Sequence, residues 1–450
     1  MEPIEVKEDI RRRARMRHVV IYGGDDLAYQ FICEYEGVLD IRMILVDDMD
    51  DVHPALRQTY EVALFSETEI CKNDYVIVCK PFIHNLDVLP PYGVARNELL
   101  KRGHVICEDF IYYRVFDAIE KGKPIMMFCG YCELGGLKQV LELTKANDEY
   151  CMLFYHIGRD TMRQYPGYDG FLAASRLCDI LIHAPILVDR GIMDVDILKM
   201  VSPAAQKIFI PQVSFRGYAP YKSSNFRRRN SVIRLFEKER YPFLYEIKNV
   251  NSMLRKGMSN EKILAELKRP DLFTEEEIRK NLEEAFRILE IMDAKGDIHI
   301  ADFVKKNYKK TLMYKDCIHA NDLIFFEYAR RLSRFLGKDW EEEINLVEER
   351  CRQTGAFFQV ASEEPILPCV AKALGLEFAT EDYLYMEKVT DEKIRMRTFD
   401  EWFEDYCDYY RAVQKINLLR SLVYKTQRVR IYRNEGSGYR LGENVRNGYS

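Results

Sequence analysis

Cys132 is the residue of this chain best placed for nucleophilic chemistry. It belongs to the run Cys129-Gly130-Tyr131-Cys132-Glu133, which follows an apolar stretch and precedes a helical pattern. At a helix N-terminus the helix dipole and the backbone amides favour a thiolate, which is the nucleophilic form of cysteine. Gly130 permits a tight turn and lets a substrate approach the backbone closely. The alternative interpretation is a small buried cysteine in a strand–helix turn.

His319 is the candidate general base, and it lies in the run Asp316-Cys317-Ile318-His319. An acidic residue three positions from a histidine can hold the imidazole in one tautomer, as the orienting acid of a catalytic triad does. Asp316 is therefore the candidate orienting residue. The alternative interpretation is a helix N-cap, formed by Asn321 or Asp322 for the helix that follows.

A loop with many hydrogen-bond donors runs from Pro211 to Tyr221, and three consecutive arginines follow it. Its glycine and its prolines give it a defined shape. Consecutive arginines suit phosphate groups, because the guanidinium pairs with phosphate oxygens, although such a run can also be a solvated surface. The candidate binding residues of this region are Gln212, Ser214, Arg216, Tyr218, Arg227, Arg228 and Arg229.

His183 is the last candidate, in the run His183-Ala184-Pro185 at the end of another apolar stretch. Pro185 favours an extended exit of the chain. Because the carboxyl ends of parallel strands meet at one edge of a sheet, His183, Cys132 and Ser214 are expected to share that edge. The alternative interpretation is a structural histidine.

The elements that position these residues are four apolar runs, which begin at Ile125, Cys151, Asp179 and Lys207. Their starts are 26, 28 and 28 residues apart. This spacing predicts strand–helix units in a parallel sheet, because each crossover between parallel strands needs a helix. The crossover helices are expected at residues 134–145, 171–178 and 194–200.

The first 120 residues predict a smaller Rossmann-like unit. Strands are expected at residues 18–22, 41–46, 75–79 and 104–107, with Gly23-Gly24 after the first and Asp47-Asp48 after the second. This is the order of a Rossmann-like unit. The glycine signature lacks its third glycine, and Asp25 and Asp26 would repel a pyrophosphate. We therefore favour a Rossmann-like unit that has lost or changed its ligand.

From about residue 227 the sequence favours helices, because apolar residues recur at helical spacing and Thr274 with Glu277 forms a capping box. We expect an α/β protein whose Rossmann-like N-terminal domain is followed by a parallel-sheet α/β domain with a helical C-terminal part. The domains are expected at residues 1–120, 121–230 for the parallel core, 231–430 for the helical part and 431–450 for a loose tail.

The net charge of the 450-residue chain is -5, which argues against a general nucleic-acid binder. Its 12 cysteines contain no two CxxC pairs, so we expect no structural metal. The first 17 residues lack the apolar segment of a signal peptide, and no stretch of 18 apolar residues occurs. These features predict a cytoplasmic protein with reduced cysteines and no membrane span.

Taken in order, the motifs resemble the WcbI family of polysaccharide biosynthesis proteins, over residues 125–337. In that family a strand leads to a Gly-x-Cys turn, and a strand exit, a Gly-Tyr-x-Pro loop and a histidine follow. The corresponding strings here are GYC at 130–132, LIHAP at 181–185, IPQVSFRGYAP at 210–220 and His319. The family often has Asn and Gln beside its cysteine, where this chain has Tyr131 and Glu133, so no role is carried over to those two.

The resemblance implies an acyltransferase that binds coenzyme A and uses acyl-CoA as co-substrate to acylate a sugar or polysaccharide precursor. Cys132 carries the acyl group in one route, and His319 deprotonates the acceptor directly in the other. The layout is also similar to SGNH-type hydrolases, with Cys132 in the place of their serine and Asp316 and His319 as their D-x-x-H pair. That arrangement implies an esterase. The remaining alternative is a non-catalytic module that binds coenzyme A or a nucleotide.

Overall fold

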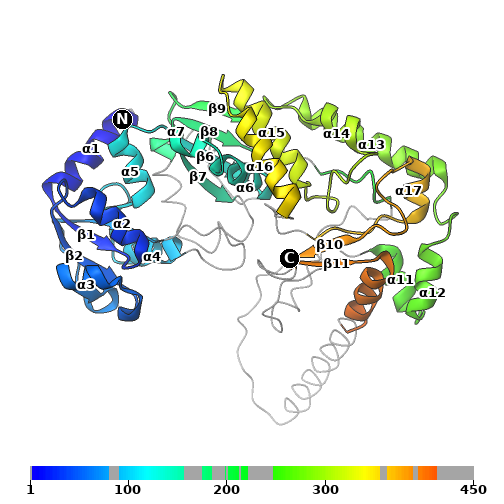
Figure 1. Cartoon of the computed structure of the whole chain (residues 1–450), viewed down its shortest axis with the longest axis horizontal. Coiled ribbons are helices and arrows are strands. Elements are labelled where there is room, and N and C mark those ends of the chain that lie inside the picture. Colours follow the sequence, from blue (N-terminus) through cyan, green and yellow to red (C-terminus); the bar gives the residue numbers. More distant parts are fainter. Residues whose placement is uncertain are drawn as a thin grey trace, which may run out of the picture. The chain divides into compact units, whose positions relative to one another are not determined.

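Figure 1 shows the computed structural model of the chain. The structure describes residues 3–80, 91–156, 175–184, 198, 201–211, 214–220, 247–354, 362–388 and 394–412. The chain divides into two compact units. Unit 1 comprises Met1–Phe215, Phe286–Tyr308 and Ile318–Gln359, and unit 2 comprises Arg216–Ala285, Lys309–Cys317 and Val360–Ser450.

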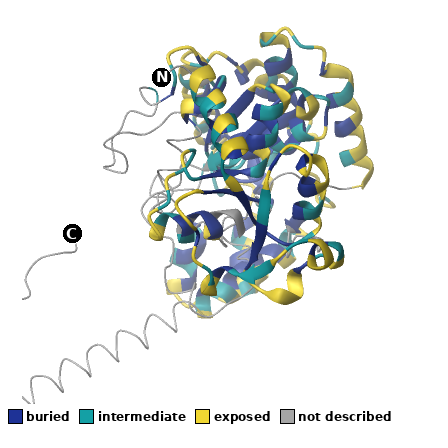
Figure 2. Ribbon diagram, turned by 90° about the vertical axis from the view of Figure 1, so that its left-hand side faces the viewer, coloured by how far each residue is buried: buried dark blue, intermediate teal, exposed yellow. Residues whose placement is uncertain are grey.

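The first sheet of unit 1 is parallel and has five strands in the order β3-β2-β1-β4-β5. The strands are β1 (His18–Tyr22), β2 (Ile41–Val46), β3 (Val62–Leu64), β4 (Asp74–Val78) and β5 (Phe110–Tyr112). This is the strand order of a doubly wound Rossmann-like sheet, as predicted. The central strands β1 and β4 are almost entirely buried, as expected for a parallel sheet covered on both faces (Figure 2).

The strand predicted at residues 104–107 is wrong, and the short strand β3 was not predicted. The last strand of the sheet lies three residues beyond the expected segment, at Phe110–Tyr112. The apolar residues 104–107 instead enter a turn closed by Asp109, whose carboxylate accepts from the Val105 amide at 2.9 Å. Cys107 has a φ of 69° inside this turn, which no extended strand adopts.

Five α-helices accompany this sheet among the described residues. They are α1 (Pro3–Met16), α2 (Asp26–Tyr35), α3 (Pro54–Thr59), α4 (Pro91–Lys101) and α5 (Tyr113–Lys121). The last of them ends at Gly122, whose left-handed conformation (φ 66°) turns the chain toward the second sheet.

The second sheet of unit 1 is parallel and has four strands in the order β7-β6-β8-β9. They are β6 (Ile125–Gly130), β7 (Cys151–His156), β8 (Ile180–His183) and β9 (Gln206–Phe209), which confirms the four predicted strands. The crossover after β6 contains α6 (Cys132–Glu142) and the short α7 (Ala146–Glu149), so the first helix begins two residues before the predicted start. Of the helices predicted at 171–178 and 194–200, only residues 175–178 and 198 are described.

One hydrophobic cluster joins the two sheets of unit 1. It includes Val20 of β1 and Phe116 of α5 together with Met127 of β6. Lys7 of α1 also pairs with Asp179 at 2.7 Å, and the same carboxylate accepts from the Ile125 amide at 2.7 Å. The predicted boundary near residue 120 therefore crosses a continuous core, and the independence of the first domain stays a prediction.

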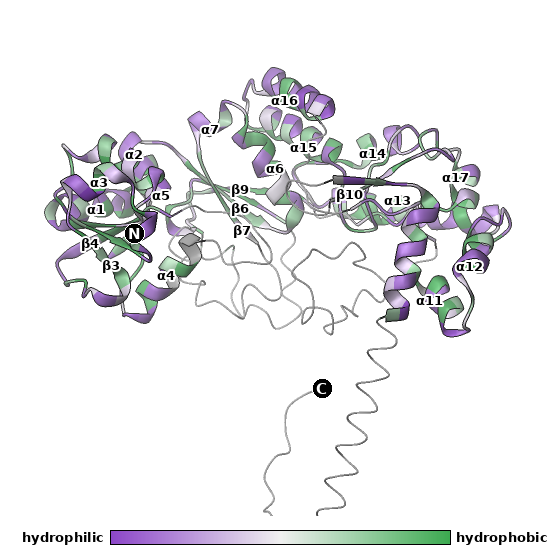
Figure 3. Cartoon of the chain, turned by 60° about the horizontal axis from the view of Figure 1, so that its bottom comes forward, coloured by the Kyte–Doolittle hydropathy of each residue, from purple (hydrophilic) through white to green (hydrophobic). Residues whose placement is uncertain are grey.

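Helices from the later part of the chain complete unit 1. They are α14 (Ala301–Asn307), α15 (Asp322–Phe335) and the largely hydrophilic α16 (Glu341–Thr354; Figure 3), with the end of α13 (Glu275–Asp293). Trp340 is fully buried before α16, and its indole N–H donates to Glu149 of α7 at 2.9 Å. Lys338 pairs with the same carboxylate at 2.6 Å. Glu149 therefore links the segment between α15 and α16 to the second sheet.

Unit 2 is mainly helical, as predicted, but it also contains an unpredicted antiparallel hairpin of β10 (Tyr385–Lys388) and β11 (Ile394–Arg397). Its helices are α11 (Lys248–Arg255), α12 (Asn260–Leu267), the start of α13, α17 (Pro368–Leu374) and residues 399–412. The predicted capping box is confirmed, because the Thr274 amide donates to Glu277 at 2.8 Å and the Glu277 amide donates to Thr274 at 3.2 Å. None of the helices in the described ranges is long and apolar enough to cross a membrane.

The contact between Glu149 and Trp340 predicts a pH-dependent loss of stability in Glu149→Gln. Burial acts to raise the pKa of Glu149, but hydrogen bonds from Lys338 and Trp340 outweigh it and hold the pKa below its ordinary value of 4.5. The carboxylate therefore stabilises the fold fully above that value, and this stabilisation is lost as the pH falls through the lowered pKa. At pH 7 we expect Glu149→Gln to cost about 1 kcal/mol.

Urea denaturation at pH 7 and at pH 3.5 measures this effect. The matched control is Glu283→Gln, on the exposed side of α13. The midpoint difference between Glu149→Gln and the wild type should shrink at the lower pH, whereas the control should change little at either. An equal loss of stability in Glu149→Gln at both pH values would show that the charged carboxylate is not the source of the stabilisation.

Candidate functional site

Cys132 is the first residue of α6 and follows the carboxyl end of β6 by two positions. Gly130 is required in this turn, because a Cβ there would lie 2.7 Å from Leu134 and 2.9 Å from Ala184. The helix therefore starts close against the end of β8. Tyr131 is the N-cap and gives no side-chain hydrogen bond to the first turn, all of which the structure describes. Cys132 is thus a partly exposed thiol at a helix N-terminus, as predicted.

The other cysteines of this sheet lie in a different environment. Cys129 lies in β6, three residues before Cys132, and is fully buried. Burial raises its pKa well above the ordinary value of a thiol. Burial also raises the pKa of Cys151 and of Cys178 to about 12. These three thiols are therefore protonated and shielded, which leaves Cys132 as the accessible thiol of the sheet edge.

The helix that begins at Cys132 packs tightly on α15. A Cβ at Gly136 would lie 2.6 Å from the Phe325 ring, so only a glycine allows this approach. Gly136 is four residues into α6 and Phe325 three residues into α15, so each helix start lies about 6 Å or less from the contact. Both helices therefore begin within about one turn of this contact. Figure 1 shows the two helices side by side.

His319 precedes α15 by three residues and is half-buried in unit 1. Asn321 is the N-cap, and its side chain accepts from the Leu323 amide at 3.2 Å. The cap interpretation is therefore confirmed for Asn321, and His319 lies two residues before this cap. Asp316 is buried in unit 2, and its role as the orienting acid stays a prediction.

His183 ends β8, where it pairs with Cys129 of β6, so it lies at the same sheet edge as the cysteine turn. Its ring is 9% exposed and packs against Phe209 at 5.1 Å between centroids. Burial lowers the pKa of His183, which favours a neutral imidazole at neutral pH. This environment suits a structural or hydrogen-bonding histidine better than a protonated histidine that binds a phosphate.

The loop that leaves β9 is held firmly at its start. The Tyr328 hydroxyl of α15 donates to the Pro211 carbonyl at 3.2 Å, and Phe215 packs against Phe286 at 5.4 Å between centroids. Ser214 lies between these two anchors and is half-buried. No local pattern in the sequence indicates a role for Tyr328. Two consecutive glycines inside α6 could have indicated the close helix contact, because glycine costs about 1 kcal/mol in a helix.

The second half of the same loop belongs to unit 2. There the Asn281 side chain donates to the carbonyls of Arg216 and Gly217 at 2.8 and 3.3 Å, and Tyr218 packs edge-on against Phe378. Arg216 is half-buried and Tyr218 is buried. The remaining candidates Gln212, Arg227, Arg228 and Arg229 lie outside the described residues.

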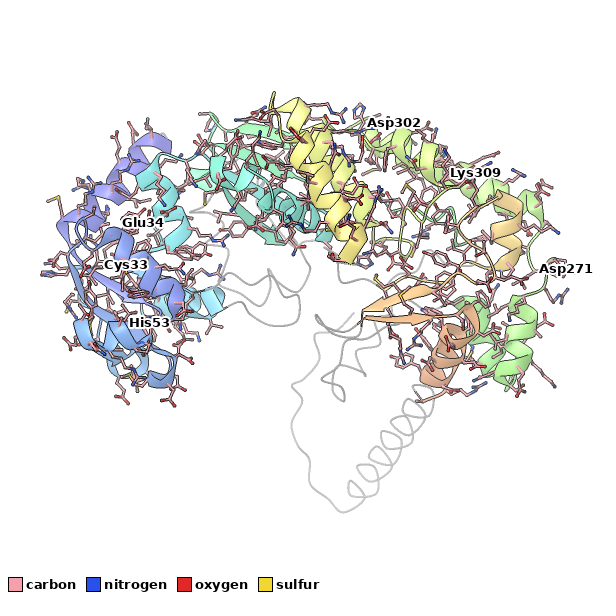
Figure 4. The ribbon with its side chains drawn as sticks, in the orientation of Figure 1. Cys33, Glu34, His53, Asp271, Asp302 and Lys309 are labelled. Carbon is pink, nitrogen blue, oxygen red and sulfur yellow. The ribbon has the colours of Figure 1, made fainter. Side chains whose placement is uncertain are left out.

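In the first sheet, contacts within the chain itself occupy the backbone groups and the space at the glycine turn after β1. A Cβ at Gly23 would lie 2.1 Å from the Cys79 carbonyl oxygen, so this glycine serves the packing of two strand ends. The Asp25 carboxylate accepts from the Leu27 and Ala28 amides, which are the groups a pyrophosphate would need. The backbone of His53, labelled in Figure 4, donates to the Gly24 carbonyl at 2.7 Å. The turn therefore favours the interpretation that this unit has lost or changed a dinucleotide site.

The described residues contain no group of three or more His, Cys, Asp or Glu side chains that could hold a metal ion.

Two comparisons with known proteins found a match. The family model of the polysaccharide biosynthesis enzyme WcbI matches residues 128–339. A solved structure of WcbI, described as a novel polysaccharide biosynthesis enzyme in its native form without a disulfide bond between coenzyme A and a cysteine, covers 64% of this chain and 90% of its own. Its TM-score is 0.47 at 12% sequence identity. No curated protein gives a significant match. The segment from residue 128 to residue 339, which contains Cys132, His183 and His319, therefore matches the WcbI family of polysaccharide biosynthesis enzymes.

Proposed function

We propose that this protein transfers an acyl group from acyl-CoA to a hydroxyl of a sugar or polysaccharide precursor. The observation that carries the proposal is the tight contact of Gly136 with Phe325, because α6 begins at Cys132 and α15 begins three residues after His319. A thiol and an imidazole near the starts of two packed helices are the types of group that covalent acyl transfer needs. The match to the WcbI family over the same residues supports a role in polysaccharide biosynthesis.

In the covalent route, His319 takes the thiol proton of Cys132 and the thiolate attacks the carbonyl carbon of the thioester. The carbon–sulfur bond to coenzyme A breaks, and the leaving thiolate receives the proton from His319. The imidazole then takes the proton of the sugar hydroxyl, whose oxygen attacks the acyl-cysteine. The carbon–sulfur bond to Cys132 breaks, and the imidazole returns the proton to the Cys132 sulfur. Each half-reaction uses the histidine once as base and once as acid.

In the direct route, His319 takes the proton of the sugar hydroxyl and the oxygen attacks the thioester of acyl-CoA itself. The coenzyme A thiolate leaves with the proton from the imidazole, and Cys132 only shapes the pocket. Both routes place coenzyme A beside the loop after β9, where Ser214 and the proposed ligands Gln212, Arg216 and Tyr218 supply donors and Arg227, Arg228 and Arg229 supply positive charge for phosphates.

The first prediction of this proposal is that coenzyme A raises the melting temperature of the protein. A ligand that binds only the folded state stabilises it by mass action, so the shift should grow with its concentration. Replacing Arg227, Arg228 and Arg229 by Ala should reduce the shift, because the phosphates lose their counter-charges. A control with Lys262, Arg279 and Lys280 replaced by Ala removes the same charge from exposed positions on α12 and α13 and should keep it. No shift at millimolar coenzyme A would refute the proposed ligand.

The second prediction is that Cys132 is alkylated faster at mildly acidic pH than Cys33 and Cys71, which are exposed thiols outside α6. The helix N-terminus favours its thiolate, and His319 adds a base. His319→Ala should slow the labelling of Cys132 several-fold and leave the other two unchanged, while His18→Ala is the matched histidine control. Mass spectrometry of the labelled peptides measures all three rates in one sample.

Turnover of acetyl-CoA with a sugar acceptor separates the two routes. His319→Ala should abolish it on either route, whereas Cys132→Ser should abolish it only on the covalent one. Full activity in His319→Ala would reject the site. Release of free acetate without an acceptor would instead favour an esterase, and absence of any turnover with slow labelling of Cys132 would favour a binding module.

A further inference from the structure

We propose that Tyr328 is a positioning residue for the coenzyme A loop, which it fixes through its hydrogen bond to Pro211. The inference rests on the proposed function, in which the loop after β9 binds coenzyme A. In this proposal Tyr328 acts through the backbone of the loop.

The hydrogen bond lies in a place where it constrains the loop. Tyr328 is 3% exposed, and its hydroxyl donates to the Pro211 carbonyl at 3.2 Å. Pro211 is the second residue after β9 and the first of the Pro211–Tyr221 loop. Because proline has no backbone N–H, its carbonyl is the single backbone group by which a hydrogen bond can hold it.

The opposite side of this strand end is closed by the segment after α13. Asp297 pairs with Phe209 twice, because its amide donates to the Phe209 carbonyl at 2.8 Å and its carboxylate accepts from the Phe209 amide at 2.7 Å. A Cβ at Gly296 would lie 2.5 Å from the Pro211 ring, so the segment fits directly against the proline. Pro211 is therefore contacted at its ring by the Gly296 segment and at its carbonyl by Tyr328, and a change at either contact would let it move.

The helix that carries Tyr328 also carries the other parts of the site. Its start presents His319, and its Phe325 packs on Gly136 of the helix that begins at Cys132. Tyr328 lies three residues beyond Phe325, so it projects from nearly the same face of α15. A single rigid helix thus sets the cysteine turn, the histidine and the start of the loop relative to one another, and the Tyr328 hydroxyl is its direct bond to that loop.

The test compares Tyr328→Phe with Tyr35→Phe in the full chain. Tyr35 is 5% exposed, and its hydroxyl donates to Asp117 at 2.7 Å, so the control also removes one hydroxyl from a buried tyrosine of unit 1. Hydrogen exchange of the peptide that covers residues 211–220 measures the loop without any ligand. We expect it to exchange at least fivefold faster in Tyr328→Phe and at the wild-type rate in Tyr35→Phe.

Calorimetric titration with coenzyme A provides the second readout. The dissociation constant should rise about fivefold in Tyr328→Phe, the size of effect that one neutral hydrogen bond has on an equilibrium. Gly296→Ala, which displaces Pro211 from its other side, should act in the same direction on both readouts. In Tyr328→Phe the rate of Cys132 alkylation should stay near that of the wild type, which separates positioning of the loop from disruption of the whole site.

Unchanged exchange of residues 211–220 in Tyr328→Phe would overturn the inference, whatever the protein binds. Equal effects of Tyr328→Phe and Tyr35→Phe on exchange and on affinity would also overturn it, because the tyrosine would then act only on global stability. Faster exchange of the loop together with no binding of coenzyme A by the wild type would instead refute the proposed function, and with it the assignment of this loop to coenzyme A.

Discussion

The close contact between α6 and α15 is the constraint on which the candidate site depends. Gly136 has no side chain, and the Phe325 ring occupies the space where a Cβ would be. A glycine in the middle of a helix costs about 1 kcal/mol relative to alanine, so its presence needs a packing reason. The reason here is that α6 begins at Cys132 and α15 begins just after His319, so the spacing of these helices sets the spacing of the two groups.

The rest of unit 1 keeps that contact rigid. Trp340 is buried just beyond α15, and it is fastened to Glu149, which lies one residue before the Tyr150–Cys151 entry into β7. The Ser333 hydroxyl of α15 accepts from the Trp340 amide at 3.1 Å and donates to the Lys338 carbonyl at 2.9 Å. The helix is thereby tied at its C-terminal end to the sheet whose opposite edge carries Cys132. A displacement of α15 would have to break this network as well as the contact at Gly136.

The sequence predicted the parts of the fold that depend on local pattern. The four strands of the second sheet were found because buried parallel strands read as continuous apolar runs. The same rule failed at residues 104–107, where an apolar run enters a turn closed by Asp109. It also missed the hairpin of β10 and β11, because Glu387 and Arg397 are charged and yet nearly buried, paired with each other across the strands at 2.6 Å.

The candidate site shows the same limit. Cys132 was predicted because a strand, a glycine and a helix start are neighbours in the sequence. A helix cap at Asn321 or Asp322 was the alternative interpretation of that segment, because both polar residues directly precede a helical pattern. Tyr328 could not be predicted, because its hydroxyl and the Pro211 carbonyl are 117 residues apart in the chain and only the packing of α15 brings them together. Local pattern thus indicates which residues can react, and long-range packing decides which residues hold them.

The two sheets of unit 1 use the same strand–glycine–helix unit with different N-cap residues. After β1, the Asp25 carboxylate caps α2 and accepts from the amides of Leu27 and Ala28, so negative charge already occupies that helix N-terminus. After β6, the cap is Tyr131, whose side chain gives the helix no such bond, and a cysteine follows. An anion is favoured at a helix N-terminus that has no carboxylate cap, and a thiolate is an anion. In the first sheet this turn therefore only connects a strand to a helix, whereas in the second sheet its position also suits a nucleophile.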